Sequence, residues 1–330
     1  MNVRLPAAVL FALTAAGVAP AQPAGPESPR TGAPPAPAIE APPPAPSPEE
    51  QEALRRREMA RLRITPRFFV EHTFNANLDD LPIDVSITRG GAGISFAMPL
   101  NERLRFSLGI DGEISNYDFD DVFDIIETVG DPFAEAYRVT VRPQILIIQS
   151  PRSAWFVGGI AQASGTFDAD FGDTLTGGGY GGFRYQVTET FAVSLGGGVT
   201  SRLEDDPLFI PIIGLEWSVG KGISLTSEGL GLTLNAGVTD EVSFLLSGGW
   251  ELREYRLEDD NPLPEGVLRD SRAQVGVGFQ WRPAPNVSLE IMGGAVVWQE
   301  FEIDDRDGHE VAEVNTDPTP FVRIGGRITF

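Results

Sequence analysis

The chain has 330 residues, with 47 acidic and 25 basic side chains, a formal net charge of −22, two histidines and no cysteine. The charge excludes an unspecific nucleic-acid binder, because phosphates would be repelled, and the lack of cysteine excludes disulfides and thiolate metal sites. No apolar run beyond the first residues reaches the roughly 18 residues of a membrane helix.

The amino-terminal quarter predicts three segments that precede a folded domain. Residues 1–21 predict an export signal peptide, with Arg4 before an apolar stretch and a small-residue cleavage pattern at its end; a disordered Ala/Pro tail is the alternative. Residues 22–48 hold 11 of the 27 prolines and predict a disordered linker. Ser47 as N-cap and Pro48 at the first helical position then predict a short, solvated periplasmic helix over 49–62.

From residue 63 onward, apolar and polar residues alternate with period two, which is typical of strands with one apolar and one polar face. In one such segment Leu104, Phe106 and Leu108 alternate with Arg105 and Ser107. We expect an all-β, up-and-down antiparallel transmembrane barrel of 12–14 strands over 63–330. The expected strands are 63–74, 84–98, 104–116, 136–149, 154–167, 174–187, 191–202, 208–218, 222–228, 230–238, 242–257, 268–282, 287–303 and 319–330, of which 222–228 and 230–238 can be a partial hairpin.

The connections alternate between tight turns and longer acidic loops, as in bacterial outer-membrane barrels. An even strand number returns Phe330 to the side on which the barrel begins. In the segment 84–98 the apolar phase changes between Val85/Ile87 and Ile94/Phe96, and the Gly90-Gly91 pair at this change predicts a bulge.

A soluble, exported sandwich or a large soluble barrel is the alternative. A barrel of a dozen long strands, however, encloses a lumen too wide for apolar side chains to fill, so the apolar face is expected to meet lipid. Aromatic residues near strand ends then predict interfacial girdles; these are Trp155, Trp217, Trp281, Phe321 and Phe330. The charged face is expected to line the interior as a pore. The predicted pore-lining residues are Arg105, Asp111, Glu113, Arg138, Arg142, Arg184, Glu251, Arg253, Arg272, Glu290, Arg323 and Arg327.

The alternating carboxy-terminal strand with Phe330 at its end resembles the insertion signal that is read by the barrel-insertion machinery of Gram-negative bacteria. The segments Pro211–Trp217, Tyr255–Asp260 and Val267–Arg272 resemble an uncharacterised outer-membrane barrel family, a domain of unknown function. The likeness spans Phe68–Phe330, with its motifs between Pro211 and Phe301. It implies the fold and an outer-membrane location, and it implies no activity and no functional residues.

Catalytic and metal-binding signals are weak. His72, on the lipid-facing phase near the outer end of the first strand, is the one residue on which a barrel-embedded lipid hydrolase could depend, and an interfacial histidine is the alternative. The glycine-rich run 177–182 predicts close packing or barrel curvature and not a phosphate loop. Acidic loop residues can hold divalent cations that bridge to lipopolysaccharide, or they can form a solvated surface; the candidates are Asp118, Asp120, Asp121, Asp304, Asp305 and Asp307.

The predicted function is therefore a porin-like passive channel for small polar solutes, with no cofactor. A non-conducting structural or surface-interaction barrel is the alternative, because inward charges can also neutralise each other and close the lumen. The long, partly apolar loop 117–135 is a candidate constriction or plug. The expected partners are outer-membrane lipid, lipopolysaccharide and the insertion machinery.

Overall fold

The computed structural model describes residues 62–79, 83–120, 134–220, 222–259 and 263–330, and these form β-strands joined by turns and loops. The predicted signal peptide, linker and helix therefore lie outside the described residues, apart from Leu62. The strands are β1 (Arg63–Asn77), β2 (Asp84–Pro99), β3 (Leu104–Asp120), β4 (Glu135–Ser150), β5 (Ser153–Thr166), β6 (Leu175–Thr188), β7 (Phe191–Thr200), β8 (Leu208–Gly220), β9 (Ile223–Glu228), β10 (Gly231–Gly237), β11 (Val242–Arg256), β12 (Val267–Ala284), β13 (Val287–Asp304), β14 (Glu310–Thr316) and β15 (Thr319–Ile328). In this part of the chain no helix is long and apolar enough to span a membrane.

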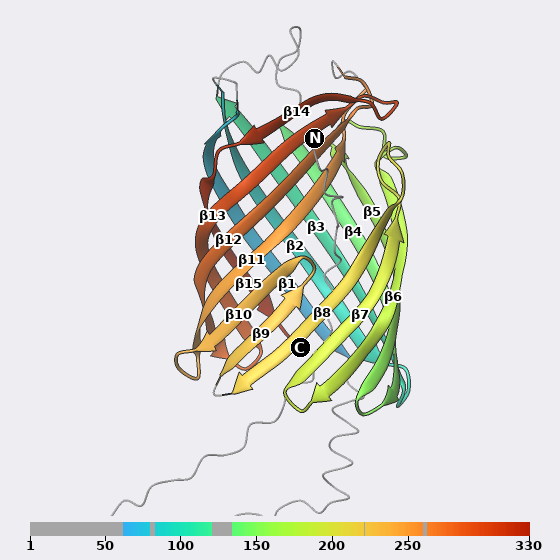
Figure 1. The fold of residues 1–330 in the computed structure, drawn as a ribbon, viewed down its shortest axis with the longest axis vertical. Helices are drawn as coiled ribbons and strands as arrows, with labels where there is room; N and C mark the ends of the chain where they lie inside the picture. Colours follow the sequence, from blue (N-terminus) through green and yellow to red (C-terminus); the bar gives the residue numbers. More distant parts are fainter. Residues whose placement is uncertain (1–61, 80–82, 121–133, 221, 260–262) are drawn as a thin grey trace, which may run out of the picture. The chain divides into compact units, whose positions relative to one another are not determined.

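Fourteen of these strands close into an antiparallel barrel (Figure 1). Consecutive strands pair from β1 to β13, β13 pairs with β15, and β15 pairs with β1 to complete the ring. The short strand β14 pairs with the outer part of β13, directly beyond the pairs between β13 and β15. On its other side Thr316 forms a bridge with Leu78, so β14 continues the line of β15 in the wall. The predicted all-β barrel of 12–14 strands is confirmed, and the short segments 222–228 and 230–238 are the hairpin β9–β10 within it.

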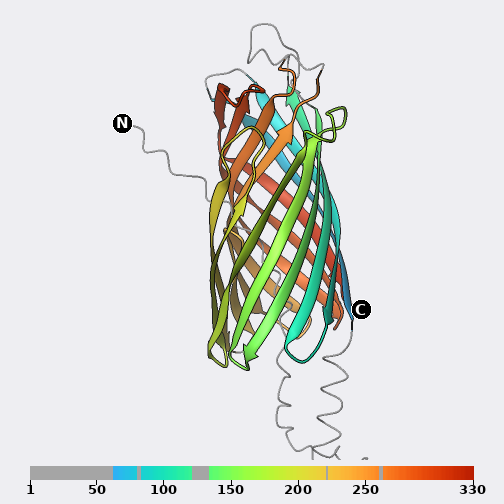
Figure 2. The same ribbon diagram turned by 90° about the vertical axis from the view of Figure 1, so that its right-hand side faces the viewer.

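The two rims of the barrel differ as the sequence predicts. Tight turns join β4 to β5, β6 to β7 and β12 to β13 at one end, which we call the short-turn rim. The longer connections after β1, β3, β5, β7 and β11 gather at the opposite end, the long-loop rim, where β14 also lies (Figures 1 and 2).

The outer surface of the wall is apolar over most of its height. Alternate residues along each strand leave large hydrophobic side chains exposed, among them Val70, Ile114, Val157, Leu195, Ile213, Val277 and Ile324. An outward-facing apolar band of this kind is typical of transmembrane barrels, whose outer side chains contact lipid hydrocarbon. Four of the five expected girdle aromatics lie on this outer face, while Phe321, at 2% exposure, points into the barrel, so its prediction is wrong.

The predicted bulge at Gly90-Gly91 is also wrong. The register runs without a break through both glycines, from Val70 and Phe69 on β1 to Ile114 and Glu113 on β3. The inward phase of β2 stays the same along the strand, but the interior it faces changes from apolar near the long-loop rim to polar farther along. Apolar residues therefore point inward at one end of the strand and outward at the other. Val85 and Ile87 point into a packed interior near the long-loop rim, whereas Ile94 and Phe96 point outward farther along the same strand.

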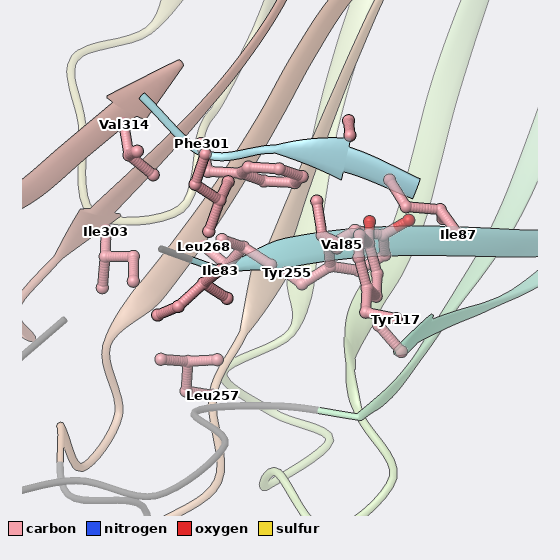
Figure 3. Packing of buried hydrophobic residues seen from close by; sticks show 13 residues of the cluster. Ile83, Val85, Ile87, Tyr117, Tyr255, Leu257, Leu268, Phe301, Ile303 and Val314 are labelled. Atoms are coloured by element: carbon pink, nitrogen blue, oxygen red, sulfur yellow. The ribbon is translucent and has the colours of Figure 1, made fainter. Parts of the chain in front are cut away.

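That packed interior is the main hydrophobic core of the described residues, and we call it the rim core. Its members come from β1, β2, β3, β4, β11, β12, β13 and β14 and from adjoining loops (Figure 3). They are Ala76, Leu78, Ile83, Val85, Ile87, Tyr117, Ala136, Tyr255, Leu257, Leu268, Phe301, Ile303 and Val314. The barrel is therefore filled by apolar side chains at its long-loop end.

Candidate functional site inside the barrel

All twelve predicted pore-lining residues lie on the inward phase of their strands. Residues that stand opposite each other on neighbouring strands point to the same face, and several of the predicted residues stand opposite another inward side chain. The pairs are Glu113 with Arg138, Asp111 with Thr140, and Glu251 with Arg272. Their inward placement follows from the period of two, because each apolar neighbour points to lipid. Their function as the lining of a conducting pore stays a prediction.

The half of the interior toward the short-turn rim is accessible to water. Here Arg67 bonds to Asp111 at 2.6 Å, and Arg142 pairs with the other oxygen of the same carboxylate. The side chain of Arg67 is 34% exposed and that of Asp111 is 23% exposed. On the wall formed by β6 and β8, Arg184 binds Glu216 through both of its carboxylate oxygens at 3.2 and 2.9 Å. This half forms a charged, hydrated vestibule.

Between the vestibule and the rim core lies a layer of charged groups, which we call the ion layer; all of its members are buried except Glu251, which is partly exposed. Its members are Glu71, Arg89, Glu113, Glu251, Arg253, Asp270 and Arg272. They come from β1, β2, β3, β11 and β12, and their side chains meet across the lumen. Four carboxylates and three guanidinium groups thus stand together, with Arg138 and Arg323 at the border of the layer.

The ion layer is held together by bidentate and shared contacts. Arg253 bonds to both oxygens of Glu113, at 2.6 and 3.2 Å, and its third nitrogen reaches Glu251 at 2.7 Å. Arg272 bridges Glu251 at 2.6 Å and Glu71 at 2.5 Å. Planar guanidinium groups suit this geometry, because one fork can serve two acceptors at once.

The most deeply buried pair is Arg89 with Asp270, whose side chains are 1% and 0% exposed. The carboxylate of Asp270 also accepts hydrogen bonds from Tyr117 Oη and Gln299 Nε2, each at 2.8 Å. Arg89 lies over the ring of Tyr117, 5.8 Å from its centroid. Because Tyr117 belongs to the rim core as well, the charged and apolar layers are joined into one closure.

The wall itself draws together at the long-loop rim. The outer end of β5 meets the edge of β11 from across the barrel, where Ser164 Oγ donates to the Glu254 carbonyl at 2.5 Å and Gly165 pairs with Arg256. A side chain at Gly165 would collide with Thr174 and Arg256, so glycine permits this approach. The lumen is therefore closed at this rim by contacts between opposite walls as well as by packing.

The glycine-rich run is confirmed as a close-packing element of β6 and β7. A Cβ at Gly182 would overlap the ring of Phe156 and the carbonyl of Leu195, and one at Gly178 would overlap the backbone of β7. Phe156 packs with Tyr180 and Ile212 in a second, smaller apolar cluster inside this part of the wall.

The acidic loop residues do not form one site. Asp118 is exposed at the end of β3, the side chain of Asp120 and the whole of Asp121 lie outside the described parts, and Asp304 pairs with Arg269. Asp305, Asp307 and His309 lie together in the turn after β13, with ligand atoms within 4.8 Å of one another. Cation binding there stays a prediction. The pKa of Asp305 lies below its ordinary value, because the backbone N–H groups of His309 and Asp307 donate to its carboxylate.

His72 lies on the outward face, as predicted. Its Nδ1 is 2.9 Å from Thr88 Oγ1, and its ring packs against the edge of Phe74 at 4.8 Å. A threonine hydroxyl and a phenyl ring do not orient an imidazole as a general base, a task that a carboxylate or amide performs in hydrolase triads. The interfacial histidine is the interpretation that these contacts favour.

Sequence reasoning missed Glu71, Arg89 and Asp270, three members of the ion layer. The signal was present, since each has the inward phase of its strand. Arg89 stands beside Gly90, at the expected change of apolar phase. Asp270 lies two residues before Arg272 in the expected strand 268–282, so its phase alone places it on the inward face.

Comparisons with known proteins give a likeness of fold. No family model and no curated protein matches the chain. Among solved structures, an outer membrane channel from Pseudomonas putida F1 is 11% identical, with a TM-score of 0.45 over 82% of this chain and 96% of its own. The P. putida toluene transporter TodX is 6% identical, with a TM-score of 0.39 over 81% and 89%. The translocator domain of the autotransporter NalP from Neisseria meningitidis is 12% identical, with a TM-score of 0.32 over 85% and 96%.

These similarities lie below the level at which function is transferred between proteins, so the activity has to be argued from the barrel itself. The barrel fold that the family resemblance implied is shown by the strand pairing itself. Membership of the uncharacterised family, whose motifs were placed between Pro211 and Phe301, stays a prediction.

Proposed function

We propose that this chain is a passive channel of the bacterial outer membrane whose passage is closed at the long-loop rim in the state described. The apolar outer surface supports a place in lipid, and the hydrated, charged vestibule supports a solute pathway. The vestibule carries the proposal, because mixed charges that remain exposed within a lumen interact with water and polar solutes.

A porin-like passage for small polar solutes, as the sequence predicts, requires the ion layer and rim core to part. Buried ion pairs gain little over apolar packing, because desolvation offsets most of their attraction. A layer of this kind can therefore open without a large loss of free energy if water replaces the lost contacts. We expect a low basal conductance with rare openings.

Planar-bilayer recordings of the purified protein test this proposal. A Phe301→Ala variant removes a large ring from the rim core and should increase the open fraction of the channel. The matched control is Val277→Ala on the lipid-facing side of β12, which should leave the recordings as in the wild type. Silence of both the wild type and Phe301→Ala in folded form would rule out a channel through this rim.

The second candidate is a non-conducting structural or surface-interaction barrel, and the sealed rim is the observation that favours it. That function predicts silent bilayers together with binding at the acidic loops.

Membrane fractionation of a Gram-negative host tests the proposed location in the outer membrane. The variant Phe330→Ala, which removes the predicted insertion signal, should lower the amount of barrel recovered from the outer membrane.

A further inference from the structure

The wall of the barrel is interrupted on one side by the short hairpin β9–β10. These strands have six and seven residues, whereas β8 has 13 and β11 has 15. The last pair between β8 and β9 is Glu216 with Thr226, and the last pair between β10 and β11 is Leu232 with Gly248. Toward the long-loop rim, the hairpin ends between its two neighbours (Figure 1).

Beyond the hairpin, β8 and β11 face each other without a strand between them. Within the described strands, Leu208–Leu215 pair only with β7, and Gly249–Tyr255 pair only with β12. The next backbone pair on this side of β11 is Arg256 with Gly165 of β5. We call these two unpaired edges the seam. No backbone pair joins them among the described strands, and at the outer end Arg202, in the loop after β7, forms an ion pair with Glu254 at 2.6 Å.

The seam lies at the depth of the lipid-facing surface. On β8 it carries Phe209, which is 69% exposed, and Ile213, which is also exposed to the outside. Leu230 and Leu232 at the end of the hairpin are exposed below it. The apolar belt therefore continues across the interruption.

Unpaired strand edges are costly at this depth. Every second residue of an edge directs its N–H and C=O away from its paired strand, and in hydrocarbon each of these groups is destabilising unless it finds a hydrogen-bond partner. Such backbone is tolerated at membrane depth where it lines a cavity or meets polar partners. Two such partners are present. Ser227 Oγ accepts from the Leu215 N–H at 2.6 Å, and Ser164 Oγ of β5 donates to the Glu254 carbonyl at 2.5 Å.

The lumen behind the seam has two chemical faces. On the β8 side, Ile212 packs with Phe156 and Tyr180 in an apolar cluster. On the β11 side, Glu251 and Arg253 belong to the ion layer. A molecule that crosses here meets apolar side chains on one flank and charged or backbone polar groups on the other.

We propose that the seam is a lateral opening through which small amphipathic organic molecules, with an apolar body and a hydrogen-bonding group, pass between the surrounding lipid and the vestibule. This proposal rests on the proposed channel function and names its substrate class. Passage requires only that side chains move aside, because the seam has no strand-to-strand hydrogen bonds that must be broken.

The test uses N-phenyl-1-naphthylamine, an apolar dye with one N–H that intact outer membranes exclude and that fluoresces in phospholipid. Cells that express the barrel should take up the dye several-fold faster than cells without it. In a chain without cysteine, the pair Ile213→Cys and Leu252→Cys introduces thiols on the two flanks of the seam. A bulky maleimide on these thiols should return dye entry to the rate of cells without the barrel.

The matched control is the pair Leu195→Cys and Leu246→Cys, which face lipid on β7 and β11 where both neighbours are paired. After the same labelling, this control should keep the wild-type rate. Each variant is first shown to be folded by its heat-modified mobility in gels, and Phe209→Cys replaces Ile213→Cys if that variant does not fold.

Dye entry that is no faster with the barrel, or that persists when the labelled seam variant is folded, overturns the lateral opening. The bilayer recordings are read separately. If the bilayers conduct but the barrel does not change the rate of dye entry, the proposed channel through the rim stands and the lateral opening at the seam is rejected. If the bilayers are silent but dye entry depends on the seam, the lateral opening is supported and the rim is rejected as the passage.

Discussion

The buried pair of Arg89 and Asp270 gives the sharpest prediction about the closure of the barrel. Replacement of Arg89 by methionine leaves the Asp270 carboxylate fully buried without its guanidinium partner, although its two neutral hydrogen-bond donors remain. Removal of one partner from a buried pair costs about 3–5 kcal/mol. We expect a loss of that order in the free energy of unfolding for Arg89→Met.

The double variant Arg89→Met/Asp270→Asn removes both charges. The amide oxygen can still accept from Gln299 Nε2, and the amide NH2 can donate to Tyr117 Oη, because a hydroxyl both donates and accepts. Because two charges no longer have to be desolvated, most of the lost stability should return. The free energy of coupling between the two sites should therefore amount to several kcal/mol in a double-mutant cycle.

The control is Arg67→Met in the vestibule, where the ion pair with Asp111 is partly exposed to water. Exposed pairs contribute about 0–1 kcal/mol, so this variant should differ little from the wild type. The assay is reversible unfolding by denaturant in lipid vesicles, followed by the fluorescence of the five tryptophans. A loss below about 1 kcal/mol for Arg89→Met, or no coupling, would refute the view that this pair is buried and closes the lumen.

Three further predictions concern local features. Gly182→Ala should destabilise the barrel by about 1–3 kcal/mol because its Cβ overlaps the ring of Phe156, whereas Gly90→Ala, with open space around its Cβ, should be close to neutral in the same unfolding assay. A phospholipase assay of wild type and His72→Ala should give equal background rates, and a loss of measurable activity in the variant would reinstate the hydrolase hypothesis. The ionised carboxylate of Asp305 stabilises the turn after β13 at any pH above the ordinary pKa of aspartate, and this stabilisation is lost as the pH falls through the lowered pKa of Asp305. Hydrogen exchange of the turn's backbone amides, followed by NMR, should therefore accelerate only below the ordinary aspartate pKa. A midpoint at or above that pKa would contradict this prediction.

Much of the barrel could be predicted from the sequence because one rule covers every strand. Side chains alternate between the two faces, so a polar residue between two exposed apolar ones, such as Arg323 between Val322 and Ile324, has to point inward. Strand number and the grouping of the loops follow from the same pattern and from the turns.

The contents of the lumen could not be predicted in this way. Alternation gives the side of the wall but not the distance to the opposite wall, which depends on how far β5 approaches β11. For that reason the apolar inward residues Val85 and Phe321 were misinterpreted, one as evidence for a bulge and the other as part of a lipid-facing girdle. The pairing of charges into one buried layer depends on the same unknown distance.

The joint between β1 and β15 has a consequence for assembly. Ile64 and Phe330 exchange backbone hydrogen bonds at 3.3 and 2.9 Å, and the ladder continues from Arg67 with Arg327 to Thr73 with Phe321. The cylinder thus becomes complete only when β15 docks on β1, more than 240 positions earlier in the sequence. Before β15 pairs with β1, the two edge strands of the sheet expose unpaired backbone groups that can pair with strands of other chains. A chaperone that shields these edges, or an insertase that itself serves as a temporary neighbouring strand, would therefore have to accompany the nascent sheet.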